Sequence, residues 1–336
     1  MNSEPSLLPT RVSQFRGYIE GFWGTWLLHV GRELGLFEEL RKKRMTAVEL
    51  AESRGYEPAY TEVWCRAAQA FDFLSGSSED GYALAAGWEP LFDTAGAWAT
   101  TYVQVSQRVY ESLEAVFLGK AFPEPSLSLR ILLSEGLKTS YAWLWHEMAP
   151  RLQVLASKLS DGGRLVEFGC GTGTGLELLK QAYPQLELTG IEQDYDCARE
   201  AERATRAVIV VGTAEECRYQ SRFDIAVFHR SLVHCERPRR AIERAAASLR
   251  PGGLLVISTE AAMPAGRCDH RSQNPRLRLG ERFFFQMFLA PDAIQSLTLE
   301  DIEEWCREEG LQLMEMVEAP DHGSPTLVYN KPAEES

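Results

Sequence analysis

Two acidic residues flank a glycine-rich segment in which a cationic ligand and a ribose could be held. The segment VEFGCGTGTG runs from Val166 to Gly175, with glycine at every second position from 169. Glycine at this density indicates a backbone that turns sharply or approaches a ligand closely. Glu167 lies two residues before Gly169, where a carboxylate favours a cation over a phosphate. Glu192 ends the next apolar run, and a carboxylate there can accept both hydroxyls of a ribose.

The glycine spacing does not match the common phosphate-binding patterns. A dinucleotide site requires G-x-G-x-x-G, but Thr174 stands where the third glycine is needed when the count starts at Gly169. Leu176 stands there when the count starts at Gly171. No Gly-Lys-Ser/Thr of a P-loop follows. The segment therefore favours adenosine with a cationic amino-acid tail over NAD.

The segment follows the first of several short apolar runs that alternate with amphipathic helical patterns. Such alternation predicts an α/β fold, a Rossmann-like doubly wound parallel sheet with helices on both faces. The expected strands occupy residues 164–168, 186–192, 207–212, 223–229 and 254–259. The expected helices occupy residues 175–183, 197–204 and 239–249. In such a sheet the glycine segment and Glu192 meet at the carboxyl ends of the strands, where ligands bind.

The N-terminal part of the chain predicts a mainly helical, winged-helix-like domain. Apolar residues recur at three- and four-residue spacings in 21–43, and a third helical pattern covers 57–73. Thr46 and Glu49 form a capping-box pattern for a short helix between them, and 75–87 predicts two strands with a turn. We expect this domain in residues 1–100, a helical connection in 101–150 and the ligand-binding domain in 151–336.

Composition and charge exclude several other classes of protein. The formal net charge is -13, and the run RKKR at 41–44 is the only basic cluster of the N-terminal half. A solvated helix end explains that run, so a DNA-binding winged helix is the disfavoured alternative and no nucleic acid is expected. No signal peptide or membrane-length apolar run is visible, which predicts a cytoplasmic protein without a membrane partner. The seven cysteines are dispersed without Cys-x-x-Cys pairs, so no metal site is expected.

Five segments resemble the class I S-adenosylmethionine-dependent methyltransferases. They are VEFGCGTG (166–173), GIE (190–192), VVGTAE (210–215), FDIAVFHRSLVH (223–234) and LRPGGLLVISTE (249–260). With its N-terminal domain, the whole chain resembles the plant-type and bacterial small-molecule O-methyltransferases. That resemblance implies S-adenosyl-L-methionine as the cofactor, a small-molecule methyl acceptor, a homodimer, and an N-terminal domain that supports dimerisation and covers the substrate pocket.

The resemblance also implies which residues contact the cofactor. Thr213 departs from the family, which often has Asp at this position beside the adenine, and Glu215 is a candidate to substitute for it. Arg230 matches a basic cofactor contact, with His229 as a neighbouring wall of the pocket. The expected cofactor-binding residues are Glu167, Gly169, Gly171 and Gly173 around the methionine portion, Glu192 and Gln193 at the ribose, Thr213 and Ala214 at the adenine, and His229 and Arg230.

The same resemblance implies His234 as the general base and Glu260 as the acid that orients it. Histidine has the side-chain pKa closest to neutrality, which suits proton removal from a phenol or another hydroxyl. The family follows its base with Asp and Trp, whereas Cys235 and Glu236 stand here, so a packing or cofactor-side role for His234 stays open. C- or N-methylation and a non-catalytic cofactor-binding protein are the alternatives to O-methylation.

Substrate selection is expected in residues 263–298, after the fifth strand. Five arginines cluster there before FFFQMF (283–288), and arginine pairs well with carboxylates. The alternative is that these arginines pair with acidic neighbours and that the aromatic residues form core or dimer surface. On the helix before the first strand, the ring of Tyr141 or Trp145 is a further candidate to face the sulfonium.

Overall fold

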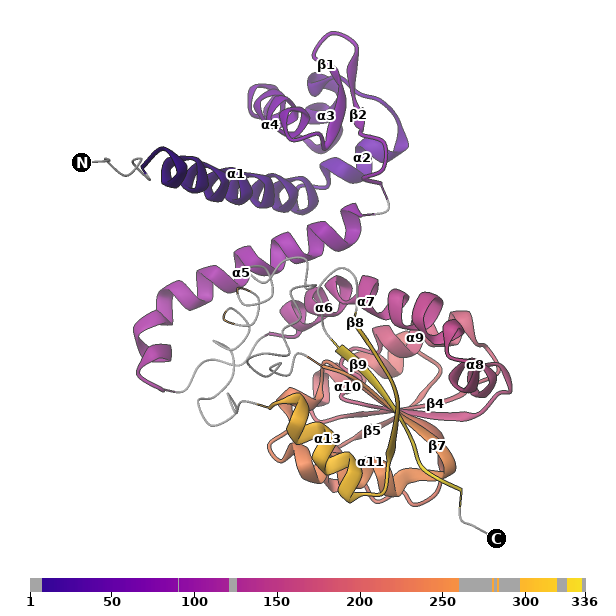
Figure 1. Cartoon of the computed structure of the whole chain (residues 1–336). Coiled ribbons are helices and arrows are strands. Elements are labelled where there is room, and N and C mark those ends of the chain that lie inside the picture. Colours follow the sequence, from indigo (N-terminus) through magenta and orange to yellow (C-terminus); the bar gives the residue numbers. More distant parts are fainter. Residues whose placement is uncertain are drawn as a thin grey trace, which may run out of the picture. The chain divides into compact units, whose positions relative to one another are not determined.

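The protein forms two compact units, Met1–Tyr110 and Glu111–Ser336, whose boundary falls within helix α5 (Phe92–Phe117). A computed structural model of the chain is shown in Figure 1. It describes residues 8–89, 91–120, 126–259, 280, 283, 297–318 and 325–333. The domain limits at residues 100 and 150 that the sequence suggests stay predictions.

The first unit is helical with one small antiparallel hairpin. Thr46 caps the third helix with the reciprocal Thr46–Glu49 hydrogen bonds that the sequence predicts. Its core combines aliphatic side chains with several aromatic rings, and Phe37 stacks on Phe92 with ring centroids 4.2 Å apart. Besides the start of α5, its elements are α1 (Leu8–Glu33), α2 (Leu36–Lys42), α3 (Ala47–Arg54), α4 (Pro58–Ala70), β1 (Leu74–Ser77) and β2 (Gly81–Leu84).

The second unit is an α/β domain with short helices ahead of its first strand. Its helices are α6 (Leu127–Gly136), α7 (Lys138–Ala142), a π-helical segment (Trp143–Met148), α8 (Gln153–Ser160), α9 (Thr174–Ala182), α10 (Tyr195–Ala204), α11 (Pro238–Ser248) and α13 (Leu299–Glu308). Its strands are β3 (Arg164–Phe168), β4 (Glu187–Glu192), β5 (Val208–Val211), β6 (Phe223–His229), β7 (Leu249–Ser258), β8 (Gln312–Glu318) and β9 (Pro325–Asn330).

The seven strands form one twisted sheet in the order β5-β4-β3-β6-β7-β9-β8. The first five strands of that order run parallel, as the sequence predicts, whereas β9 runs antiparallel to both β7 and β8. The sheet is therefore mixed, and its C-terminal hairpin was not among the predicted strands. Strand order reverses between β3 and β6, which places the expected ligand site at the carboxyl ends of these two strands.

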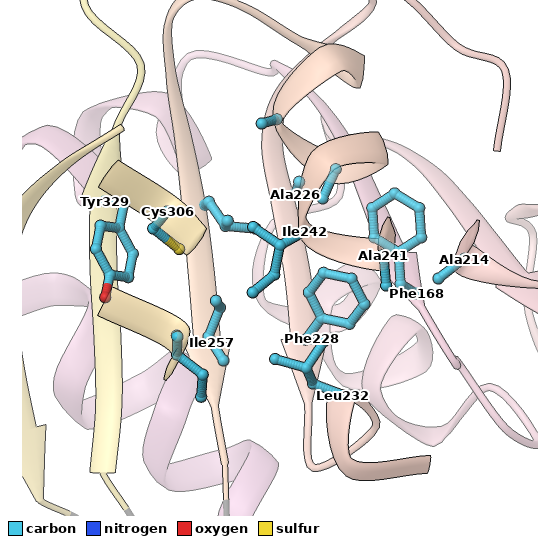
Figure 2. Packing of buried hydrophobic residues seen from close by; sticks show 14 of the residues in the cluster. Phe168, Ala214, Ala226, Phe228, Leu232, Ala241, Ile242, Ile257, Cys306 and Tyr329 are labelled. Carbon is cyan, nitrogen blue, oxygen red and sulfur yellow. The ribbon is translucent and has the colours of Figure 1, made fainter. Parts of the chain in front are cut away.

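Helices cover both faces of the sheet and enclose two apolar cores. One core packs α11 and α13 against the sheet, and Figure 2 shows Phe228 and Ile257 of the strands beside Ile242 of α11. In this core the rings of Phe168 and Phe228 stack 4.9 Å apart. The opposite core packs Leu165 and Val227 against α7, α8, α9 and the π-helical segment. Together the two cores fix the strands whose ends carry the candidate site.

No helix in the described part of the chain is long and apolar enough to span a membrane. The cytoplasmic location expected from the sequence stays a prediction.

Candidate functional site

Most of the predicted cofactor-binding residues meet at one edge of the sheet. They follow or end four neighbouring strands, β5, β4, β3 and β6, at their carboxyl ends. Glu167 and Glu192 end or nearly end β3 and β4, and His229 is the last residue of β6. Three further sets lie in the loops that follow: Gly169, Gly171 and Gly173 after β3, Gln193 after β4, and Thr213 and Ala214 after β5.

The three predicted glycines all adopt left-handed backbone angles, but they are needed for different reasons. Gly169 has φ 71°, and a Cβ there would lie 2.6 Å from the Cβ of Ser231. Gly171 has φ 54°, and the nearest atom to a Cβ there is the Oγ of Ser134 at 3.8 Å. Gly169 is therefore constrained by close packing, whereas Gly171 is constrained by its backbone angle beside open space.

Backbone amides fix the carboxylate of Glu192 from two directions. The Gly171 N–H donates to Oε2 at 2.8 Å, and the Asp194 N–H donates to Oε1 at 2.9 Å. Asp194 is itself held, because its Oδ1 accepts from Cys197 N–H at 2.8 Å and its carboxylate pairs with Arg130 at 3.4 Å. Each carboxylate oxygen can accept more than one hydrogen bond, so Glu192 is oriented and still able to accept ribose hydroxyls.

Glu167 is fully buried and has far fewer partners. The hydroxyl of Tyr141 donates to Oε1 at 2.6 Å. Oε2 has no hydrogen-bond partner among the described residues. Burial raises the pKa of Glu167 to about 7, the nearby charge of Glu192 adds to this effect, and the bond from Tyr141 opposes it.

Tyr141 connects α7 to the glycine segment. Its ring lies against the first turn of α9, where a Cβ on Gly175 would approach the ring to 2.3 Å. Its ring centroid is 4.0 Å from that of His229. Burial and the charge of Glu167 raise the pKa of its hydroxyl well above the usual range. The hydroxyl is thus a neutral donor to Glu167, while the second predicted aromatic residue, Trp145, lies fully buried in the core beside α9.

The end of β6 brings His229 and Arg230 to the same edge. His229 is buried, and its Nε2 lies 2.9 Å from the Oγ of Ser140. Arg230 has φ 57°, an angle that few residues other than glycine adopt, and its N–H donates to Ser258 O at 2.7 Å. A strained backbone held in this way is typical of functional sites, which supports the predicted position of Arg230 in the site.

The residues expected beside the adenine differ in their exposure. Ala214 is buried in the core under α11, Thr213 is half-buried, and Gln193 is exposed. Glu215, the candidate to substitute for the family's Asp, accepts a hydrogen bond through Oε1 from Arg237 N–H at 3.0 Å. That contact satisfies the backbone at the start of α11, so at least one oxygen of Glu215 has a structural role.

The predicted base His234 lies in a short helical turn just beyond β6. Its backbone N–H donates to Ser231 O at 3.0 Å, and its side chain is exposed to solvent. Nearby protein atoms partly remove the imidazole from water, and this desolvation lowers its pKa. The positive charges of Arg230 and Arg130 lower the pKa further. Glu260, the predicted orienting acid, lies outside the described residues, as does all of 263–296 except Gly280 and Phe283.

Three contacts of this site were missed by the sequence analysis. They are the bond from Tyr141 to Glu167, the contact of Ser140 with His229, and the pair of Arg130 with Asp194. Each joins a helix that precedes the sheet to a strand end far along the chain, so no local pattern reports it. Gly175 is the one signal that was present, because a glycine in the first turn of a helix indicates a close neighbour. No group of three or more His, Cys, Asp or Glu that could hold a metal ion occurs among the described residues.

The comparison with protein families identifies the class of this chain. Residues 142–316 match a family described as "Methyltransferase domain", which covers about half of the chain and includes the whole glycine segment. The protein therefore belongs to the methyltransferase-domain family, and the predicted class of enzyme is confirmed. Among curated relatives, the O-methyltransferase resE of Aspergillus sclerotiorum is 26% identical over 51% of this chain and 62% of its own length. The chain spans about half the length of the curated relatives it matches.

Solved structures show that the fold extends over both units. The pyocyanin biosynthetic protein PhzM is 18% identical, with a TM-score of 0.72 over 97% of this chain and 100% of its own. Human N-acetylserotonin methyltransferase, solved with S-adenosylmethionine, is 13% identical, with a TM-score of 0.71 over 99% of this chain and 100% of its own. At these identities the matches establish a shared fold and confirm the predicted one, a helical N-terminal region before an α/β domain.

Proposed function

We propose that this protein transfers the methyl group of S-adenosyl-L-methionine to a small-molecule acceptor, at the oxygen of a hydroxyl or carboxyl group. One observation carries the proposal: Glu192 is fixed by the amide of Gly171, so the ribose-binding acid and the glycine segment form one preformed unit. Membership of the methyltransferase-domain family supports the same conclusion. The likeness to an enzyme named as an O-methyltransferase favours oxygen as the methylated atom.

The residues at the sheet edge fit the cofactor. Glu167 presents a buried oxygen without a partner among the described residues, which suits a cation. Glu192 is oriented to accept ribose hydroxyls, and the open space at Gly171 lets backbone approach a ligand. When bound, S-adenosyl-L-methionine supplies an electrophilic methyl group on a positively charged sulfur. The residues that would hold it are Glu167, Gly169, Gly171, Gly173, Glu192, Gln193, Thr213, Ala214, His229 and Arg230.

We propose His234 as the general base that takes the proton of the acceptor hydroxyl. Its lowered pKa keeps the imidazole neutral at pH 7, which is the form able to accept a proton. Glu260 follows β7, the neighbour of β6, and we propose that it orients the imidazole. General-base help of this kind contributes roughly 10²–10⁴-fold, and positioning of the acceptor supplies much of the remainder. No metal ion enters this proposal.

The test of this function has a binding arm and a transfer arm. Calorimetry should detect binding of S-adenosyl-L-methionine that Glu192→Ala abolishes, with the exposed Glu187→Gln on the same strand as the matched control. A screen with radiolabelled methyl groups against phenols, carboxylates and amines should identify the acceptor class. Unchanged affinity in Glu192→Ala would overturn the cofactor site. Binding without transfer to any acceptor would favour a regulatory protein that only binds the cofactor.

The residues after His234 are the reason to test C- or N-methylation as a second candidate function. Cys235 and Glu236 stand where the resembling family has Asp and Trp, so the sequence around His234 departs from the family's pattern for a base. C- or N-methylation needs positioning of the acceptor but less help from a base. Under O-methylation, His234→Ala should lower kcat by roughly 10²–10⁴-fold with nearly unchanged cofactor affinity. Retained turnover in this variant would move the assignment to carbon or nitrogen.

We further propose that residues 1–100 form a winged-helix-like dimerisation domain, joined through a helical connection in 101–150 to a catalytic domain in 151–336. The support is an apolar stripe along α1 whose members recur at alternating spacings of three and four residues and are all exposed. A second copy of this chain is the partner that such a stripe fits, and the acidic charge argues against nucleic acid. The stripe consists of Val12, Phe15, Ile19, Phe22 and Trp26.

Sedimentation of the wild type should report a dimer that Phe22→Glu disrupts. Val63→Glu, at another exposed apolar position on α4, is the matched control and should leave the dimer intact. A monomeric wild type would overturn the dimer. A gel shift of DNA at low salt would overturn the exclusion of nucleic acid.

A further inference from the structure

We propose that Glu167 and Tyr141 couple cofactor binding to the release of one proton. In the cofactor-free protein below neutral pH, Glu167 is mostly a neutral carboxylic acid, and it becomes a carboxylate when the positively charged methionine portion of the cofactor binds. This inference rests on the proposed function and adds a proton linkage to it. The step is balanced: the O–H bond of Glu167 breaks, its electron pair stays on the carboxylate, and the proton passes to solvent.

The geometry around Glu167 favours the neutral acid. The side chain is completely buried, and a single neutral donor, the hydroxyl of Tyr141, reaches one of its two oxygens at 2.6 Å. The other oxygen has no hydrogen-bond partner among the described residues. An isolated buried charge costs far more free energy than a buried neutral group, so such a carboxyl takes up a proton instead.

The neighbouring groups that act on the pKa of Glu167 are a neutral hydroxyl and a negative charge. Tyr141 of α7 and Cys170 of the glycine segment both have pKa values raised by burial, so both are neutral near pH 7. Glu192 of β4 adds a negative charge and raises the pKa of Glu167 further. His229 of β6 lies against the ring of Tyr141, and its Nε2 lies 2.9 Å from the Oγ of Ser140. The pKa of about 7 for Glu167 agrees with this inventory.

A bound cation reverses this balance. A positive charge within a few ångströms of a buried carboxyl favours its ionised form and lowers its pKa. The proton that Glu167 holds near neutral pH is then released as the cofactor binds. By linkage, affinity for the cofactor should fall by about tenfold for each pH unit below pH 7, because the proton and the cation compete for the same carboxylate.

Tyr141 acts as a positioning residue for this carboxyl. Its hydroxyl binds Oε1 and leaves Oε2 as the oxygen available to the ligand. The ring is located by its packing against Gly175, since no larger residue at that position would let the ring lie so close to α9. The same hydrogen bond lowers the pKa of Glu167 toward neutrality, so Tyr141 also sets the pH at which the exchange takes place.

Calorimetry in several buffers of different ionisation enthalpy measures the protons released on binding. For the full-length protein and S-adenosyl-L-methionine, release should approach one proton at pH 6 and decline toward zero above pH 8. Glu167→Gln should abolish this pH-dependent release, and the difference between the two proteins removes any proton exchanged by the ligand itself. Circular dichroism establishes that the isosteric variant is folded.

Tyr141→Phe separates positioning from packing, because it keeps the ring and removes only the hydroxyl. Its midpoint of proton release should rise by about one pH unit, and its affinity at pH 7 should fall by roughly tenfold. Tyr183→Phe is the matched control, since that hydroxyl donates to Trp145 O at 3.1 Å, away from Glu167, and its midpoint should stay unchanged.

The outcomes separate this inference from the proposed function. Binding of S-adenosyl-L-methionine with identical proton release in wild type and Glu167→Gln at every pH would overturn the proton linkage and leave the cofactor assignment intact. An unshifted midpoint in Tyr141→Phe would overturn the role of Tyr141. Absence of binding in the wild type at any pH would overturn the proposed function itself.

Discussion

Glu167 near the end of β3 and Glu192 at the end of β4 share one edge of the sheet, one face and a buried position, yet their surroundings differ. Glu192 receives N–H groups from Gly171 and Asp194, one on each oxygen. Glu167 receives one tyrosine hydroxyl, and its second oxygen has no partner among the described residues. Both side chains face the core beside α9, because Glu167 lies two residues after Leu165 and Glu192 four residues after Leu188, and side chains an even number of positions apart on a strand share a face.

The difference shows that burial alone does not decide what a carboxylate can do. Backbone N–H groups stabilise the charged form and fix its direction, which suits recognition of the neutral hydroxyls of a ribose. A lone hydroxyl leaves a buried carboxyl close to its neutral form, which suits a group that is to receive a cation. On the proposed function, Glu192 recognises the ribose hydroxyls of the cofactor and Glu167 recognises its positive charge.

The largest expected effect comes from removing the charge of Glu192. Glu192→Gln should weaken binding of S-adenosyl-L-methionine by about 100-fold at both pH 6 and pH 8, because the amide loses charge-assisted bonds to the ribose and to the Gly171 amide. Glu167→Gln should weaken binding about tenfold more at pH 8 than at pH 6, because the wild-type carboxyl is mostly protonated at pH 6 and must first release that proton. Titration calorimetry at the two pH values makes the comparison.

Glu187→Gln is the control for both variants, since that side chain pairs with Arg164 at the surface. A loss in Glu192→Gln that grows with pH as steeply as in Glu167→Gln would contradict the distinction between the two carboxylates.

The second effect is on the stability of the cofactor-free protein. Between pH 4.5 and about 7, folded Glu167 keeps a proton that the unfolded chain has lost, so the free energy of unfolding falls as the pH rises through this window. Relative to Glu167→Gln, the wild type should lose up to about 3 kcal/mol across it. Urea unfolding of both proteins at several pH values checks this, and parallel pH profiles would refute it.

The sheet edge was largely predictable from the sequence, for a physical reason. Strands buried on both faces produce short apolar runs, and β3 and β6 occupy the expected residues 164–168 and 223–229. β8 and β9 were not predicted. The exposed residues of β8, among them Leu313, Met314 and Met316, break the burial that marks a central strand. The antiparallel pairing of this hairpin with β7 is set by tertiary contacts.

The partners of the two glutamates were much less predictable. Glu167 can be selected from the sequence because it lies two residues before Gly169. Glu192 can be selected because it ends the next apolar run. Their different surroundings depend on Tyr141, 26 residues before Glu167, and on two loop amides whose directions only the folded backbone fixes. Side-chain type at a position can be read from the sequence, whereas the donors that meet it across elements cannot.

A smaller effect is expected from filling the space beside Tyr141. Gly175→Ala places a Cβ where the ring now lies, so the ring must move away from α9 and its hydroxyl away from Glu167. Overpacking should cost about 2 kcal/mol of stability and raise the pKa of Glu167 further. Gly17→Ala is the control, because nothing lies near that position on α1 and alanine there should stabilise the helix. Thermal unfolding of both variants makes the measurement, and equal shifts would contradict the proposed packing.

The smallest effect is expected from Ser140, whose neighbour His229 packs against the ring of Tyr141. Ser140→Ala removes the Oγ that lies 2.9 Å from His229 Nε2, which should cost about 1 kcal/mol because both groups are buried. The hydroxyl of Tyr141 still reaches Glu167 in this variant, so the pH dependence of proton release on cofactor binding should match the wild type. Ser157→Ala, which removes an exposed hydroxyl bonded to Asp161, should leave stability nearly unchanged. A shifted midpoint in Ser140→Ala would show that His229, through the tyrosine ring, also sets the protonation of Glu167, and the contrast between the two glutamates would then extend to a third strand.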